Sequence, residues 1–377
     1  MLFRSVPGML HGRVVRPPST GATLASVDEG SIANMPGLVK VVVKKNFVGV
    51  VCDKPWQAIK AAEALKVTWT PGPNLPRREG FTSYMRNHPG RRDQFSVNSK
   101  DVEAKLASAA SRVKATYEYP YQMHGSMGSS CAVADVRGGK ATVWSATQAV
   151  YPLRNTVAMV LGLQPADVRV IYTRGSGCYG LNGADAVSYD AALMSQAVGK
   201  PVRVQLSRKD EMVWGENYGL PFAVDQEVGL DANGTIVDWQ HDVWSYPHST
   251  RPEGVNGVNL LAAWYLAEPH VPGVPGNPPL PPGGSHRNAI PLYDFPNQRV
   301  TNHLVVQSPL RASALRALGG HANVFAVESF MDELAQTAGI DPVEFRLKHL
   351  KDPRARAVVE TVAQKAGWKN AAVPEGR

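Results

Sequence analysis

Cysteine is scarce in this 377-residue chain, which contains only Cys52, Cys131 and Cys178. The three lie far apart, form no Cys-x-x-Cys pair, and have no histidine at a metal-ligand spacing. Because closely spaced Cys and His residues are the usual ligands of zinc and iron–sulfur sites, we expect neither an iron–sulfur cluster nor haem within this chain. The odd count offers no disulfide framework. Cys52 and Cys131 are expected to pack as small buried apolar side chains.

Long apolar runs are missing as well. No segment approaches the roughly 18–20 residues that span a bilayer. The first residues, Met1-Leu-Phe-Arg-Ser5, lack the sustained apolar core of a signal peptide. The composition, 44% apolar and 19% charged, is that of a folded chain rather than a disordered one. We therefore expect folded domains with no membrane span, in either the periplasm or the cytoplasm.

Acidic side chains are in the minority. There are 32 Asp and Glu against 40 Lys and Arg, which gives a formal charge of +8. Such a balance favours an anionic cofactor, an acidic partner or a carboxylate substrate. The basic residues are dispersed, and the one tight group, Arg86, Arg91 and Arg92, lies in a stretch that contains Pro and Gly and is predicted to be a solvated loop. Nucleic-acid binding is therefore not expected.

Glycine, by contrast, is concentrated in one segment. Residues 175–185 (Gly-Ser-Gly-Cys-Tyr-Gly-Leu-Asn-Gly-Ala-Asp) contain four glycines between a strand-like run, 168–172, and a helix-like run, 186–198. Glycine lets backbone amides approach a ligand closely, and amides at a helix start carry partial positive charge. The segment predicts a cofactor-binding loop for an anionic or oxo group.

One hypothesis for this loop is a nicotinamide dinucleotide site. Gly175-x-Gly177-x-x-Gly180 matches the dinucleotide fingerprint, and a second strand-like run, 201–206, completes a possible βαβ unit. Arg208 stands near the place where an NAD site has an acid, which favours NADP. However, Thr173 and Arg174 separate the strand from the first glycine, whereas the fingerprint turn leaves the strand at once.

Four motifs in a fixed order support a second hypothesis. They are Pro7-Gly-Met-Leu-His-Gly-Arg-Val-Val-Arg-Pro-Pro18, Trp144-Ser-Ala-Thr-Gln148, Ser176-Gly-Cys-Tyr-Gly180 and Ser308-Pro-Leu-Arg-Ala-Ser-Ala-Leu-Arg-Ala-Leu-Gly319. Together they resemble the molybdopterin-binding large subunit of the xanthine dehydrogenase and aldehyde oxidase family, over nearly the whole chain. Within that family, the amino-acid sequences of these motifs are most similar to those of the branch that contains nicotinate dehydrogenase and isoquinoline oxidoreductase. We prefer this hypothesis over the dinucleotide one.

The resemblance implies particular site residues. Gln148 would donate to an oxo ligand of the metal, and the loop Gly177, Cys178, Tyr179 and Gly180 would bring backbone amides to the same group. Arg316 would stabilise negative charge on the substrate and is the expected catalytic residue. Two further cofactor-binding residues are Arg311, which could instead form an ordinary surface salt bridge, and Gly319. Tyr179 and Tyr246 are candidate substrate contacts, and the metal is expected to have no direct protein ligand.

This chain departs from the family pattern at three places. The family's Arg-Gly-Phe-Gly is Arg316-Ala-Leu-Gly319 here, which puts the backbone approach at Ala317 in question. Purine-oxidising members have a Glu where this chain has Asn182-Gly183, which argues against a purine substrate. The family's general base, a glutamate in a Gly-x-Gly-Glu segment, has no counterpart. We therefore expect this polypeptide to hold part of the site without turning over alone.

The resemblance also implies an α+β fold with an α/β-hammerhead unit followed by a mixed α/β molybdenum-cofactor-binding domain. We expect a hammerhead over residues 1–76, a first molybdopterin domain over 77–350 and the start of a second over 351–377, with both ends truncated. The implied cofactor is molybdopterin with molybdenum, in the cytosine dinucleotide form. The implied partners are a ferredoxin-like small subunit with [2Fe–2S] clusters and a cytochrome c acceptor. The substrate would be an N-heteroaromatic acid such as nicotinate, or an aldehyde, with water as the oxygen source. A non-catalytic remnant is the alternative.

Local signals predict several elements. Ser99 is a candidate N-cap for a helix over 100–111. Asp231-Ala-Asn-Gly234 predicts a hairpin turn. The eight prolines of residues 269–291 predict an extended loop. Asn323–Ala338 predicts a helix, and Asp341-Pro-Val-Glu344 predicts the N-cap and first turn of the next one.

Overall fold

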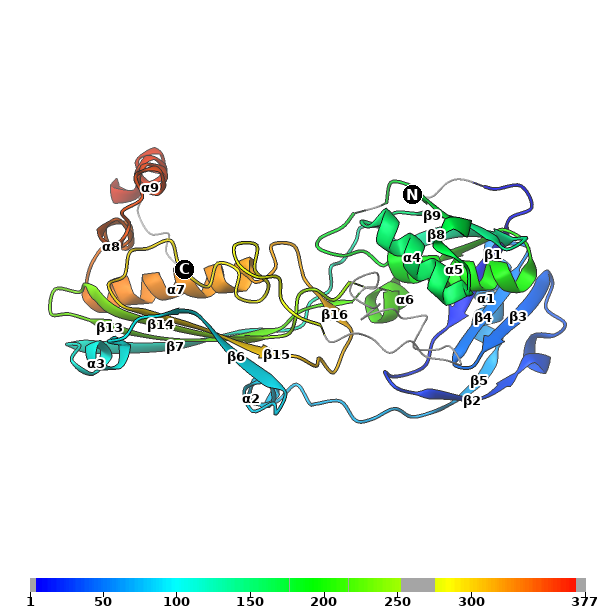
Figure 1. The fold of residues 1–377 in the computed structure, drawn as a ribbon, viewed down its shortest axis with the longest axis horizontal. Coiled ribbons are helices and arrows are strands. Elements are labelled where there is room, and N and C mark those ends of the chain that lie inside the picture. Colours follow the sequence, from blue (N-terminus) through cyan, green and yellow to red (C-terminus); the bar gives the residue numbers. More distant parts are fainter. Residues whose placement is uncertain (1–4, 176, 216, 252–274, 371–377) are drawn as a thin grey trace.

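Two large β-sheets, each covered by helices, organise the computed structural model, as the α+β expectation required (Figure 1). The structure describes residues 5–175, 177–215, 217–251 and 275–370. The sheets lie at opposite ends of the long axis of the molecule (Figure 1). Ser176, in the glycine-rich loop, and the first part of the proline-rich segment 269–291 lie outside the described residues.

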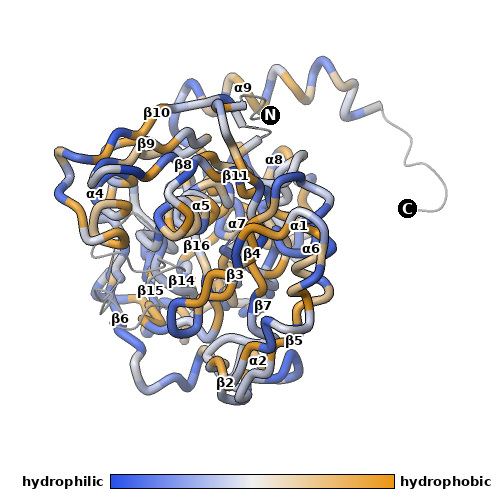
Figure 2. Tube along the Cα trace, turned by 90° about the vertical axis from the view of Figure 1, so that its right-hand side faces the viewer, coloured by the Kyte–Doolittle hydropathy of each residue, from blue (hydrophilic) through white to orange (hydrophobic). Residues whose placement is uncertain are grey.

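The larger sheet has seven strands and combines the first unit of the chain with later residues. In spatial order its strands are β10 (Val168–Tyr172), β9 (Lys140–Ser145), β8 (Cys131–Arg137), β11 (Val202–Gln205), β1 (Leu10–Val15), β4 (Phe47–Cys52) and β3 (Leu38–Lys44). The junction is between β1 and β11, which pair in parallel with Leu10 opposite Val202. Strand β4, whose residues are apolar and orange in Figure 2, is buried along its whole length.

The core of this sheet is formed against helix α5 (Ala184–Val198), which is buried from Ala184 to Ser195. Helix and strands lie so close that a Cβ at Gly12 would be 2.4 Å from the Sδ of Met194. The helix ends at Gly199, which has a φ of 64°. Helix α4 (Val150–Leu161) packs beside it and ends at Gly162, also left-handed. Both helices end at glycines that the sequence places there.

The second sheet has five strands and one long covering helix. Its order is β6 (Arg91–Asn98), β15 (Gln298–Val305), β14 (Ile236–Ser245), β13 (Phe222–Leu230) and β7 (Ser111–Tyr119). Helix α7 (Gly320–Ala338) lies along it (Figure 1). Stacked rings of Trp239 and Phe295, with centroids 4.7 Å apart, anchor their joint core. The predicted turn at 231–234 joins β13 to β14.

The remaining elements connect or flank these sheets. The strands are β2 (Thr23–Asp28) with β5 (Lys66–Thr70), and β12 (Tyr218–Gly219) with β16 (Ala312–Ser313). The helices are η1 (Glu29–Ile32), α1 (Pro55–Ala64), α2 (Phe81–Arg86), α3 (Val102–Ala107), η2 (Pro165–Asp167), α6 (Arg208–Asp210), the π-turn η3 (Glu211–Gly215), α8 (Pro342–His349), α9 (Pro353–Lys365) and η6 (Trp368–Asn370). Residues 71–77 contain no helix or strand.

Two local predictions are wrong. Helix α3 is shorter than residues 100–111, and Asp101 occupies its N-cap position. Ser99 instead pairs with β15, because its hydroxyl accepts a hydrogen bond from the backbone N–H of Gln298 at 3.1 Å. The arginine group at 86–92 is not a loop, since Arg86 ends α2 and Arg91 begins β6. Arg86 donates to Asp225 at 2.7 Å and lies 5.3 Å from the ring centroid of Trp244. In both cases the local structure depends on residues that are distant in the sequence, which the local sequence does not reveal.

No helix within the described ranges is both long and apolar enough to cross a membrane. The expected boundaries at residues 76 and 350 stay a prediction.

Candidate functional site

Three of the motifs singled out from the sequence meet in space, together with one further segment. The junction of β9 and α4 contributes Gln148, and the loop between β10 and α5 contributes Tyr179 and Gly180. The segment after β14 contributes Thr250 and Arg251, and the loop between β16 and α7 contributes Arg316. Hydrogen bonds join all four segments, so the structure brings together residues that are distant in the sequence.

The glycine-rich loop lies directly against the arginine loop. The backbone N–H of Arg316 donates to the carbonyl of Tyr179 at 2.8 Å. Gly180 has a φ of 121°, and a Cβ there would lie 2.3 Å from the carbonyl oxygen of Ala314. Only glycine fits at this contact, because the obstacle is backbone rather than a movable side chain. The expected proximity of Tyr179, Gly180 and Arg316 is therefore a feature of the fold.

Hydrogen bonds of the residues before and after Gln148 hold its backbone in place. The side-chain amide of Asn182 donates to the carbonyl of Ala146 at 3.1 Å, which ties the glycine-rich loop to the start of this segment. The hydroxyl of Thr147 accepts a hydrogen bond from the backbone N–H of Ala149 at 3.0 Å. Gln148 itself is exposed. The sequence singled out Asn182 only as a departure from purine-oxidising relatives, whereas here it positions the Gln148 segment.

Arg251 is a site residue that the sequence analysis missed. Its Nη1 donates to Oε1 of Gln148 at 2.7 Å, and its Nη2 donates to the carbonyl of Gly180 at 3.0 Å. A single guanidinium therefore joins the two segments that the sequence predicted to converge. The surrounding Ser-Tyr-Pro-His-Ser-Thr-Arg resembles no motif of the preferred hypothesis, so the sequence contained no signal for it beyond an arginine soon after a strand.

The arginine loop contains unusual backbone. Ala317 and Leu318 have φ values of 78° and 58°, in the left-handed region. Ala317 thus adopts a backbone conformation that glycine adopts more readily than alanine. Gly319 donates its N–H to the carbonyl of Gly284 at 3.1 Å, and a Cβ on it would lie 2.2 Å from the carbonyl oxygen of Ser285. The turn is kept, and residues 284–285 support it.

Tyr179 folds back over its own loop. A Cβ at Gly177 would lie 3.0 Å from the Tyr179 hydroxyl, and the Tyr179 side chain is 39% exposed. Cys178 is half-buried between them. A partly exposed phenol at the centre of the loop can meet a ligand.

Tyr246 has a different environment. It is 1% exposed and stacks on Tyr121 in the core, with ring centroids 6.3 Å apart. Burial raises the pKa of the Tyr246 phenol far above its usual value. In this structure Tyr246 is a buried core residue rather than an exposed one.

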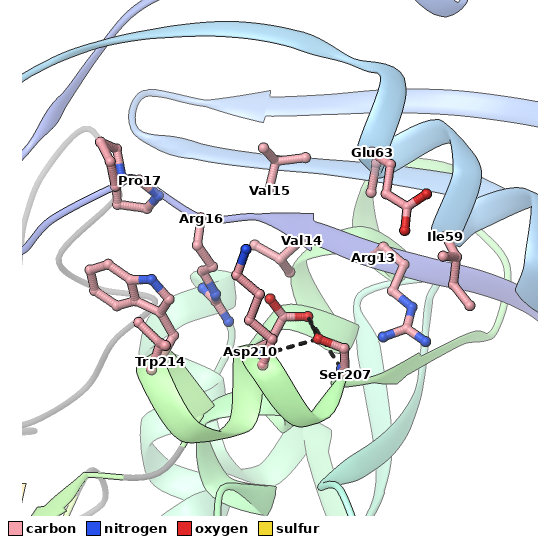
Figure 3. A pocket seen from close by; sticks show the side chains of 14 residues that line it. Arg13, Val14, Val15, Arg16, Pro17, Ile59, Glu63, Ser207, Asp210 and Trp214 are labelled. Atoms are coloured by element: carbon pink, nitrogen blue, oxygen red, sulfur yellow. Dashed lines mark hydrogen bonds between the residues drawn. The ribbon is translucent and has the colours of Figure 1, made fainter.

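Arg311 is buried, at 6% exposure, so the alternative of a surface salt bridge is wrong. Its Nη1 donates to the carbonyl of Trp214 at 2.7 Å. Trp214 and Arg16 line a cavity of about 540 Å³ (Figure 3). Arg16 also forms an ion pair with the buried Asp190. Burial raises the pKa of the Asp190 carboxyl, and the Arg16 and Arg311 cations oppose that shift. Arg311 thus belongs to a buried cluster of charged groups with Arg16 and Asp190.

A cavity of about 350 Å³ opens beside the glycine-rich loop. Its walls combine that loop with the starts of β8 and α5 and with β11. The lining includes Ser126, Ser129, Arg174, Gly177, Asn182 and Arg203. Hydroxyls, amides and two guanidinium groups form a donor set that suits phosphate and other anionic groups. The residues present therefore fit an anionic cofactor.

Three histidines lie close together beside the arginine loop. Burial lowers the pKa of His248 to about 3 and also lowers those of His286 and His321. His321 bonds through Nδ1 to the carbonyl of Leu318 at 2.8 Å. In the part of the chain that the structure describes, no group of three or more His, Cys, Asp or Glu side chains could hold a metal ion.

Comparisons with known proteins support the family resemblance. A family model described as the molybdopterin cofactor-binding domain matches residues 86–248 and 278–350. The chain is 42% identical to a nicotinate dehydrogenase subunit of Pseudomonas putida over 97% of its own length and 30% of that protein. It is 26% identical to the beta subunit of isoquinoline 1-oxidoreductase of Brevundimonas diminuta, over 98% of this chain and 47% of that one.

Solved structures show the same fold. Quinoline 2-oxidoreductase from Pseudomonas putida 86 superposes with a TM-score of 0.74 at 17% identity, covering 97% of this chain and 51% of that one. Aldehyde oxidoreductase from Desulfovibrio gigas also gives 0.74, at 19% identity, covering 98% and 45%. The chain spans about half the length, or less, of these relatives.

The dinucleotide hypothesis is not supported. Strand β10 ends at Tyr172 and α5 begins at Ala184, so a long loop separates them, whereas a dinucleotide fingerprint needs a tight turn. Strands β10 and β11 lie in one sheet but are separated by β9 and β8. The family match is to a molybdopterin domain instead.

Proposed function

Because this chain belongs to the molybdopterin-binding subunits of the xanthine dehydrogenase family, we propose that it forms one side of the active site of a molybdenum hydroxylase. The substrate is an N-heteroaromatic acid of the nicotinate type, or an aldehyde, and water is the oxygen source. The observation that carries the proposal is the convergence of Gln148, Tyr179–Gly180 and Arg316, joined through Arg251.

The site residues have distinct roles in this proposal. The Gln148 side chain and the amides around Tyr179 and Gly180 would hold the oxygen-bearing face of the molybdenum group, because neutral donors bind oxygen without adding charge. Gly177 and Cys178 keep the glycine-rich loop close to the cofactor. Gly319 maintains the turn that follows Arg316. The Arg316 guanidinium stabilises negative charge that develops on the substrate. When bound, molybdenum–molybdopterin supplies oxygen transfer from water and takes up two electrons from the substrate carbon.

Three further residues, one partly exposed and two buried, have roles toward the substrate or the cofactor. Tyr179 offers a partly exposed phenol to a ring or a carbonyl. Tyr246 shapes the pocket from behind, through its packing on Tyr121. Arg311 acts from the buried charge cluster on the anionic part of the cofactor, rather than as a surface residue. The formal charge of +8 suits a carboxylate substrate and an anionic cofactor.

The finer identity of cofactor and partners is part of the proposal. We assign the cytosine dinucleotide form of molybdopterin, a small subunit with two [2Fe–2S] clusters, and a cytochrome c as the final acceptor. The nicotinate dehydrogenase and isoquinoline 1-oxidoreductase relatives are both named as subunits, and therefore as parts of larger assemblies, which supports a heteromer.

The test is to purify the chain with its co-purifying subunits from cells that make molybdopterin. We expect stoichiometric molybdenum, release of a cytosine nucleotide on acid treatment, and reduction of a dye by nicotinate or by an aldehyde. An Arg316→Lys variant should keep its molybdenum and lose most of its turnover, on the order of a hundredfold. A metal-free complex without turnover would mean a non-catalytic remnant and would refute the proposal.

A further inference from the structure

We propose that Arg251 is a positioning residue of this site, which sets the orientation of the Gln148 amide and fixes its distance from the glycine-rich loop. The inference rests on the proposed function. It begins with the two hydrogen bonds of one guanidinium, to Oε1 of Gln148 at 2.7 Å and to the carbonyl of Gly180 at 3.0 Å.

The first consequence concerns the amide of Gln148. A guanidinium has only donors, so it can satisfy only the oxygen end of a side-chain amide. With Oε1 turned to Arg251, the Nε2 end is the one that Gln148 presents to a ligand. A rotated amide would place two N–H groups against the cation, which is unfavourable. Arg251 thereby makes Gln148 a donor toward the site, as an oxo ligand requires.

The second consequence concerns spacing. Gln148 is exposed at the start of α4, where its own backbone imposes no single side-chain orientation. The Gly180 carbonyl is fixed, because its loop lies against Ala314 and Arg316. A planar fork that binds both oxygens holds them at one separation, which a lysine ammonium cannot do with the same geometry. The two halves of the donor set are therefore held together by Arg251.

Arg251 is itself well anchored. The preceding residue, Thr250, is buried and donates its hydroxyl to the carbonyl of Ala312 at 2.7 Å. The side chain of Asn217 reaches the Thr250 carbonyl at 3.4 Å. Ala312 begins β16, and the loop that follows β16 contains Arg316. The short segment with Thr250 and Arg251 therefore contacts Gln148, Gly180 and the strand that leads into the arginine loop. Both acceptors that Arg251 meets among the described residues are neutral oxygens, and its positive charge also favours anionic groups at the site.

The experiment compares Arg251→Met, Arg251→Lys, Gln148→Ala and the double variant Gln148→Ala/Arg251→Met in the purified complex. Arg154→Met is the matched control, since this arginine on α4 donates to the neighbouring Asn155 side chain and lies over the ring of Tyr151. Molybdenum content, the Mo(V) electron paramagnetic resonance spectrum, kcat and KM are measured for each protein.

We expect Arg251→Met to keep its molybdenum, to change the Mo(V) spectrum and to lower kcat by roughly tenfold to a hundredfold, with KM changed by less than about threefold. The double variant should match Gln148→Ala alone, because Arg251 acts through Gln148. Arg251→Lys should fall between the wild type and Arg251→Met, and it keeps the test valid if the methionine variant does not fold.

Three results would overturn the inference. They are an unchanged spectrum and kcat in Arg251→Met, additive losses in the double variant, and a loss confined to KM for acids and absent for aldehydes, which would make Arg251 a direct substrate contact. A wild-type complex without molybdenum would instead refute the proposed function itself.

Discussion

Gly180 is the residue at which the two loops of the site touch most closely. We expect Gly180→Ala to lower the free energy of unfolding by about 1–3 kcal/mol and to abolish molybdenum retention, because the new methyl group would overlap the Ala314 carbonyl oxygen at 2.3 Å. Chemical denaturation and metal analysis measure the two effects. Gly125→Ala is the control, since Gly125 also has a positive φ, 66°, but a Cβ there meets nothing within 4 Å. Equal effects of both substitutions would contradict the contact.

Ala317 offers a prediction in the opposite direction. A left-handed alanine costs roughly 1–2 kcal/mol, whereas glycine adds about 0.5–1 kcal/mol of unfolded-state entropy. Ala317→Gly should therefore raise the free energy of unfolding by up to about 1 kcal/mol, measured by urea denaturation. Ala357→Gly, at an exposed position inside α9, should lower it by about 1 kcal/mol. If Ala317→Gly is destabilising as well, the backbone at this position is not strained.

At the residue scale, the sequence singled out the candidate site residues that lie in recognisable motifs. Glycine density identified the Tyr179–Gly180 loop, and the family resemblance identified Gln148 and Arg316. Arg251 could not be predicted, because its role depends on two oxygens contributed by segments far from it in the chain. The burial of Arg311 could not be predicted either, since an arginine is normally exposed unless partners deep in the fold satisfy it.

Helix α8 shows an element whose start is encoded locally. Asp341 accepts the amides of Val343 and Glu344 at 2.9 and 3.1 Å, and Pro342 follows it, as the sequence predicted. Asp341→Ala should lower the free energy of unfolding by about 1 kcal/mol, because these two amides lose their acceptor. Thermal or urea denaturation measures the change. Asp341→Asn keeps an acceptor oxygen and should cost less than half as much; equal losses would place the effect elsewhere.

Elements whose limits depend on distant partners were predicted less well. Helix α3 begins later than expected because Ser99 pairs with β15, and the arginines at 86–92 enter a helix and a strand because Asp225 and Trp244 receive Arg86. By contrast, α4 and α5 end at Gly162 and Gly199 through the left-handed backbone that glycine adopts readily, which is a local property. Caps and turns depend on neighbouring residues, whereas strand pairing depends on the whole fold.

At the scale of the whole molecule, buried neutral histidines predict sensitivity to acid. Asn323 donates to the carbonyls of Ser285 and Arg287, so its Oδ1 faces Nε2 of His241 at 3.2 Å. Nε2 must then carry the proton, and Nδ1 accepts from Gln226 at 3.1 Å. Burial lowers the pKa of His241 to about 4 and that of His248 to about 3. Adding a second proton to either ring in the folded protein therefore lowers the free energy of unfolding.

Acid should therefore destabilise the fold. Both folded-state pKa values lie below the ordinary value of 6.5, so the unfolded chain binds the protons first as the pH falls. The free energy of unfolding should be constant above about pH 6.5 and should fall below it by up to about 1.4 kcal/mol per pH unit for each ring. Urea denaturation between pH 7.5 and 5 measures the slope, and His241→Gln should reduce it. A flat profile over this range would show that these histidines protonate without unfolding.

The general architecture was predicted correctly as α+β, because the family resemblance implied that fold. The way in which the sheets combine was not predictable, since β1 and β11 pair across most of the first two hundred residues. Strand composition indicates that a segment is buried in a sheet, but it does not identify the neighbour.

That pairing has a consequence for the physical integrity of the chain. Residues 71–77 contain no regular structure, which makes them the natural place for a protease to cut. Yet β1, β4 and β3 belong to the same sheet as β11 and β8, and Val202 pairs with Leu10 across the join. A nicked molecule would therefore stay a single particle, held by hydrogen bonds and the shared core instead of the covalent link. For the same reason, the first strands cannot complete their sheet during synthesis until β11 has left the ribosome.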